Sequence, residues 1–195
     1  MGLPIINQQQ TKFYMKTMSI ILCFFIVTNL KAQDYLTRNG SISIYSHTEL
    51  EDVKGNNNEV VSLLNTASGN FEFKVAIKSF HFEKQAMEDH FNDEYYMQTD
   101  KFPKAGFSGK ISNPADVNFL KDGVYNVNVS GNLTIKDVTK PITAKGTITV
   151  KNGKVTAQST FSVKRKEFNV IGQSFVQSKL SDDIQLTVNC EYDKR

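Results

Sequence analysis

The sequence contains no tryptophan and little proline, glycine or cysteine. With only 4 Pro and 11 Gly in 195 residues, collagen-like and low-complexity classes are excluded. Hydrophobic residues make up 39% of the chain and charged residues 22%, which excludes a mainly disordered protein. In place of tryptophan, 14 Phe and 7 Tyr supply large side chains for a core. The length fits one folded domain with an extension.

No hydrophobic run is long enough for a transmembrane helix, which needs about 20 apolar residues. The longest, Ser19–Thr28, follows Lys12 and Lys16 and precedes Leu30–Ala32, which is the pattern of a secretory signal. We predict a signal peptide over residues 1–32. Two starts stay open: Met1, or Met15 or Met18 with residues 1–14 an overcalled start. The domain then spans residues 33–195, in the periplasm or secreted.

The chain has only two cysteines, Cys23 and Cys190, so it can form at most one internal disulfide. Leu22 stands before Cys23, where a lipoprotein signal needs a small residue, so we expect no stable membrane anchor. Removal of residues 1–32 leaves Cys190 alone, and an internal disulfide is excluded. Cys190 is in phase with Leu186 and Val188, so we interpret it as a small buried hydrophobic residue.

Excess charge of one sign is also missing from the predicted domain. The chain has 23 basic and 20 acidic side chains, and three lysines with no acid fall within residues 1–32. Residues 33–195 are therefore neutral, and we expect neither nucleic acid nor an anionic membrane surface as a partner. The short basic run Lys164–Lys166 is either a solvent-exposed strand end or a rim that attracts an acidic head group.

Apolar and polar residues alternate with period two over most of the predicted domain, which is typical of half-buried strands. The clearest run is Tyr125–Lys136, and Phe71–Lys78 and Ile184–Tyr192 repeat it. The period changes to about four between residues 82 and 95, where an amphipathic helix is predicted. The fold is therefore all-β with one short inserted helix, and about eight antiparallel strands form either a closed barrel or a sandwich.

Asn152-Gly153 separates two alternating runs and predicts a tight hairpin. Pairing around this turn keeps apolar residues opposite apolar residues. The predicted pairs are Val150 with Val155, Ile148 with Ala157, Ala144 with Phe161, and Ile142 with Val163.

Motifs for chemistry are absent. The three histidines, His47, His81 and His90, form no HxH or HExxH pattern, and no cysteine pair is available for zinc. The nucleophile motif GxSxG is also missing. We expect no enzymatic activity, no cofactor and no metal.

Three segments occur in an order and spacing that are known from other proteins. The first comprises Phe80–Phe82, Met87–Met97 and Asp100–Gly109; the second is Val129–Ile142, and the third is Phe161–Phe168. The three segments resemble parts of the YceI-like family. The first resembles its helix and the strand that follows, and the second resembles its G-x-L-T-I-x-G-V-T-K-x-V segment. The third resembles the penultimate strand, where many members have R-x-D-F. The resemblance covers roughly residues 34–192.

This chain departs from that pattern at Asp137, which replaces a glycine, and at Glu167, which replaces an aspartate. Tyr45-Ser46-His47 stands, offset, where the first strand usually has His-Ser. The sequence is most similar to a shorter branch of the family.

The resemblance implies an exported, antiparallel lipocalin-like barrel of about eight strands that holds a long isoprenoid chain. The expected partner is an isoprenoid or another long-chain lipid. The alternative is a structural or interaction module, in which the same barrel has no lipid ligand. The oligomeric state stays open, and a homodimer is possible. The predicted pocket wall consists of inward positions of the strands: Phe73, Val75, Val127, Val129, Ile148, Phe161, Leu186 and Val188.

Overall fold

The computed structural model describes residues 34–48, 52–174, 177 and 180–195. The predicted signal peptide, residues 1–32, lies outside the described residues. Within the described ranges, no helix combines the length and the apolar character that a membrane span requires.

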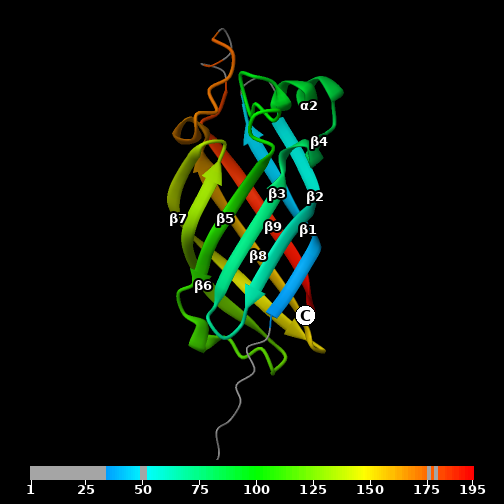
Figure 1. Cartoon of the computed structure of the whole chain (residues 1–195), viewed down its shortest axis with the longest axis vertical. Coiled ribbons are helices and arrows are strands. Elements are labelled where there is room, and N and C mark those ends of the chain that lie inside the picture. Colours follow the sequence, from blue (N-terminus) through cyan, green and yellow to red (C-terminus); the bar gives the residue numbers. More distant parts are fainter. Residues whose placement is uncertain (1–33, 49–51, 175–176, 178–179) are drawn as a thin grey trace, which may run out of the picture. The chain divides into compact units, whose positions relative to one another are not determined.

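Eight antiparallel strands form a closed barrel, and a two-residue strand, β4, pairs with one of them (Figure 1). The strands are β1 (Asp34–His47), β2 (Asp52–Asn65), β3 (Asn70–Ala76), β4 (His81–Phe82), β5 (Lys104–Ile111), β6 (Gly123–Ile135), β7 (Val138–Lys151), β8 (Lys154–Lys164) and β9 (Asp183–Lys194). Their order is β1-β9-β8-β7-β6-β5-β3-β2, and pairing of β1 with β2 closes the ring. The prediction of an all-β barrel is confirmed, and the sandwich is excluded because every strand of the ring has two neighbours.

The predicted helix is observed as α2 (Gln85–Asn92), shorter than the interval 82–95. Phe82 belongs to β4, and Asp93 already has an extended backbone. Three short 3-10 turns complete the described elements: η2 (Ile77–Ser79), η3 (Pro114–Asp116) and η4 (Arg165–Phe168). We call the end of the barrel that carries α2 and η4 the upper end, and the end with the β7–β8 turn the lower end.

The hairpin at Asn152-Gly153 is confirmed. Both residues have positive φ, 52° and 78°, as a type I′ turn requires. The predicted pairs Val150–Val155 and Ile148–Ala157 are present.

The two upper pairs of this hairpin prediction are wrong, because the β7–β8 register stops at Gly146–Ser159. Ala144 and Ile142 therefore do not pair with Phe161 and Val163. Above this point each strand stays paired with its other neighbour up to the upper end. β7 pairs with β6 as far as Val138, and β8 pairs with β9 as far as Lys164. β7 and β8 follow these partners and separate.

The lower half of the barrel is closely packed. Seven of its side chains are almost fully buried: Tyr35, Leu64, Ile111, Val150, Val155, Cys190 and Tyr192 are each at most 2% exposed. The hydroxyl of Tyr192 forms a hydrogen bond of 2.7 Å with Ser62 Oγ, so its burial leaves no unpaired polar atom. These side chains close the lower end.

Candidate functional site

The upper half of the barrel encloses an apolar cavity of about 410 Å³. This volume lies in the range of sites that enclose a small molecule. All eight residues predicted as the pocket wall line the cavity: Phe73, Val75, Val127, Val129, Ile148, Phe161, Leu186 and Val188. That these side chains contact a lipid stays a prediction.

The wall follows from the alternation of the strands. On β6, Val127, Val129 and Leu133 line the cavity, while Asn126 and Asn128 are exposed. Successive side chains of a strand point to opposite faces, so closure of the sheet directs one apolar set inward. The sequence pattern was sufficient to find these positions.

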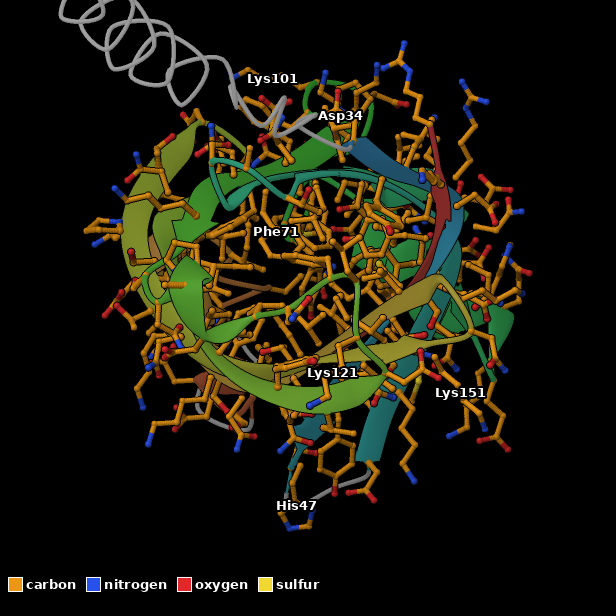
Figure 2. The ribbon with its side chains drawn as sticks, turned by 90° about the horizontal axis from the view of Figure 1, so that it is seen from below. Asp34, His47, Phe71, Lys101, Lys121 and Lys151 are labelled. Carbon is orange, nitrogen blue, oxygen red and sulfur yellow. The ribbon has the colours of Figure 1, made fainter. Side chains whose placement is uncertain are left out.

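The floor of the cavity is aromatic. Phe71 on β3 lines the cavity and packs against Phe73 and Tyr192, with ring centroids 5.8 and 6.4 Å apart. Figure 2, seen from below, shows Phe71 inside the ring of strands. Leu64, which pairs with Phe71, and Val155, which pairs with Tyr192, are fully buried, so the cavity ends where the packed lower half begins.

The roof of the cavity includes the apolar face of α2. Met87 and Phe91 line the cavity, and Phe91 packs against Phe82 and Phe80 at ring-centroid distances of 5.0 and 5.4 Å. The helix was predicted from a spacing of about four residues among the apolar positions Phe82, Ala86, Met87, Phe91 and Tyr95. The strand-based list of wall residues omitted its apolar face, although the same spacing could have added it.

Arg165 organises a second part of the roof. The residue is 7% exposed, and its guanidinium donates five hydrogen bonds, all to main-chain carbonyl oxygens of the following segment. The acceptors are Val170, Ile171, Gln177, Leu180 and Ser181, at 2.6 to 3.5 Å. Burial lowers the pKa of Arg165 from its ordinary value. The sequence alone favours two interpretations of the run Lys164–Lys166, a solvent-exposed strand end or a rim that attracts an acidic head group. Neither describes Arg165, which is buried and whose N–H groups are paired with carbonyl oxygens.

Lys136 links the two parts of the roof. Its Nζ donates to the carbonyl oxygens of Tyr96 and Asn169, at 3.1 and 2.7 Å, and burial lowers its pKa. Tyr96 follows α2 in the chain, and Asn169 follows η4. No sequence pattern identifies this contact, because its partners are main-chain atoms distant along the chain.

The chemistry of the lining suits an apolar ligand. Carbon-rich side chains from β1, β3, β6, β7, β8 and β9 surround the cavity. In the part of the chain that the structure describes, no group of three or more His, Cys, Asp or Glu side chains is placed to hold a metal ion. Such a site can bury hydrocarbon, which gains about 0.8 kcal/mol for each CH₂ removed from water.

Comparison with known proteins places this architecture in context. A family model described as the YceI-like domain matches residues 35–192. A search of curated proteins returns no significant match.

Several solved structures share the fold. A polyisoprenoid-binding domain from Saccharophagus degradans, implicated in plant cell wall breakdown, has a TM-score of 0.72 at 12% identity, covering 85% of this chain and 100% of its own. BcnA from Burkholderia cenocepacia has a TM-score of 0.66 at 20% identity, with 79% and 96% covered. The YceI protein of Campylobacter jejuni has a TM-score of 0.58 at 23% identity, with 76% and 90% covered.

Proposed function

The chain belongs to the YceI-like family, and from this premise we propose that it binds a long apolar, polyisoprenoid-like chain inside the barrel, for transport or storage. The observation that carries the proposal is the apolar cavity of about 410 Å³ in the upper half. A related structure, from Saccharophagus degradans, is described as a polyisoprenoid-binding domain, which supports the same class of ligand.

The energetics of such binding are favourable without an ionic contact. One five-carbon isoprene unit gains roughly 3–4 kcal/mol on full burial. A few buried units therefore suffice for about micromolar affinity after the cost of association. A lining of Val, Ile, Leu and Phe supplies this contact, so no charged anchor is required.

The cavity is also an argument against the alternative function, a structural module without a lipid. Such a barrel needs a filled interior, because an empty apolar space loses packing contacts. The lower half has this filled interior, and the upper half does not. The difference between the halves supports the ligand-binding function.

The proposed place of action is the periplasm or the extracellular space. The leader pattern that ends at Ala32 supports export. N-terminal sequencing of the protein from the cell envelope tests this, with a first residue of Gln33 expected. A chain that retains Phe24-Phe25 would contradict removal of the leader.

The function is tested by mass spectrometry of organic extracts from the purified protein. We expect a polyisoprenoid or similar long-chain lipid in near-stoichiometric amount. Protein stripped of lipid should bind retinol, an isoprenoid alcohol whose fluorescence rises in an apolar site. Extracts without lipid, together with no binding of retinol, would contradict the proposal and leave the structural module.

A further inference from the structure

The wall of the barrel is discontinuous between β7 and β8. Hydrogen-bonded pairing of these strands ends at Gly146–Ser159, although both strands continue toward the upper end. Figure 1 shows β7 bowing outward on the left of the view. We call the interval between residues 140–145 of β7 and residues 160–167 of β8 and η4 the β7–β8 window.

Both ends of the window are closed by defined contacts. At its lower edge the strands approach closely: a Cβ on Gly146 would lie 2.6 Å from the carbonyl oxygen of Gln158, and Ser159 Oγ donates to the carbonyl of Lys145 at 2.8 Å. At its upper edge, Lys140 Nζ and Glu167 Oε2 are 3.9 Å apart, with side chains 42% and 54% exposed.

The inner edges of the window are part of the cavity wall. Ile142 and Ala144 on β7, and Phe161 and Val163 on β8, all line the cavity. They are only partly buried, whereas Ile148, lower on β7, is 1% exposed. The apolar lining of the cavity therefore extends along both edges of the window.

We propose that the β7–β8 window is the passage through which an extended apolar chain enters and leaves the cavity; this inference rests on the proposed function. Its edges are apolar inside and carry small or short residues, Ala144, Gly146 and Ser159, at the lower end. Such a slot fits a single extended hydrocarbon chain, the class of ligand that the cavity suits.

Among the described residues, the lower end and the part of the roof held by Arg165 and Lys136 are more strongly closed than the window. The packed lower half blocks the lower end. At the upper end, opening the roof breaks the five hydrogen bonds of the buried Arg165 and the two of Lys136. The window is spanned at its upper edge by an exposed ion pair, which contributes little to stability. Local opening favours the region with the fewest buried contacts and hydrogen bonds.

The window also gives a role to two motif residues. Lys140 lies in the segment Val129–Ile142, and Glu167 lies in the segment Phe161–Phe168. The fold brings these two segments to opposite sides of the window, with the two charges facing across it. The carboxylate at position 167 and the lysine at position 140 therefore form a weak contact that must break when the window widens.

A reversible staple tests the proposal. Thr143→Cys and Ser162→Cys place thiols on exposed positions across the window, in a Cys23→Ser background. Cys190 does not compete, because it is buried and its pKa is raised to about 12. After reaction with a bis-methanethiosulfonate linker, loading and release of retinol should both slow by about tenfold or more. Affinity should stay unchanged, and dithiothreitol should restore both rates in the same sample.

A matched control ties the same strands below the window. Thr149→Cys and Thr156→Cys lie opposite each other in the paired part of the ladder. The same linker there should leave both rates unchanged. Thr143→Cys capped with methyl methanethiosulfonate controls for added bulk and should also exchange at the wild-type rate.

The ion pair between Lys140 and Glu167 allows a second test that needs no cross-link. Glu167→Gln removes the ion pair and should speed retinol exchange several-fold without changing affinity.

The outcomes separate the two proposals. Wild-type rates in the stapled protein, or equal slowing by the control staple, would overturn the window as the passage. Failure of the unstapled wild type to bind retinol, together with organic extracts that contain no lipid, would instead overturn the proposed function.

Discussion

Arg165 and Lys136 place two positive charges beneath the surface with main-chain carbonyl oxygens as their hydrogen-bond acceptors. A buried charge is tolerated when its donors are satisfied, and the planar guanidinium of Arg165 offers five N–H groups to five carbonyls. Sequence reasoning recognised the run Lys164–Lys166 but not which of its members is buried. Such a distinction depends on where the acceptors Val170, Ile171, Gln177, Leu180 and Ser181 lie, and these residues follow no periodic pattern.

Cys190 provides a prediction about pH. Burial raises the pKa of its thiol to about 12, from 9.0, so the folded chain keeps the proton that the unfolded chain releases above about pH 9. The stabilising effect is therefore complete below pH 9 and is lost as pH rises toward 12. Between about pH 8 and about pH 10, this group should lower the free energy of unfolding by about 1.4 kcal/mol.

Urea unfolding of wild type and Cys190→Ala at these two pH values measures the effect. The alanine variant should lose less stability over the interval. Tyr192, whose pKa burial also raises, is present in both proteins. Equal losses in the two proteins would contradict a protected thiol.

At the scale of elements, local patterns were good predictors where local chemistry decides the structure. Alternation identified the inward face of β6, and Asn152-Gly153 identified the turn and the lower register of the β7–β8 hairpin. The separation of these strands above Gly146 could not be predicted this way, because the apolar pattern continues through Ala144 and Phe161. It depends on competition among neighbours, since β7 follows β6 and β8 follows β9.

The turn itself can be tested by Gly153→Val. Gly153 has a φ of 78°, and a Cβ there would meet nothing within 4 Å, so the cost comes from the backbone alone. A β-branched residue at positive φ should lower stability by about 1 kcal/mol or more. Asn152→Gly keeps an allowed conformation and should change stability little. Thermal unfolding measures both, and an unchanged melting temperature for Gly153→Val would contradict the strained position.

At the scale of the whole barrel, one ring of strands combines a packed half with a hollow half. The lower half supplies stability through fully buried side chains, and the upper half supplies the cavity. The sequence predicted which residues face inward but not which of them pack together, because both halves show the same alternation. The volumes of side chains from different strands decide where space remains.

Truncation of one residue in each half should show the difference. Leu64→Ala, in the packed half, should cost about 3–5 kcal/mol, because the side chain is fully buried and leaves a new hole. Phe161→Ala, which enlarges existing space, should cost only about 1–2 kcal/mol, below the usual range for a packed phenylalanine. Denaturant unfolding of lipid-free protein compares the two variants. A larger cost at Phe161 than at Leu64 would mean that the upper half is packed as well.

The most direct measurement of ligand binding is retinol titration of Val129→Glu against Asn128→Glu. Val129 lines the cavity, and the neighbouring Asn128 is exposed on the other face of β6. A carboxylate at position 129 would have to be buried against hydrocarbon, at a cost of several kcal/mol (~2–7 kcal/mol for a polar group even before charge). With circular dichroism showing both variants folded, we predict that Asn128→Glu binds retinol like the wild type and that Val129→Glu does not bind it. Wild-type binding by folded Val129→Glu would contradict an apolar ligand inside the barrel.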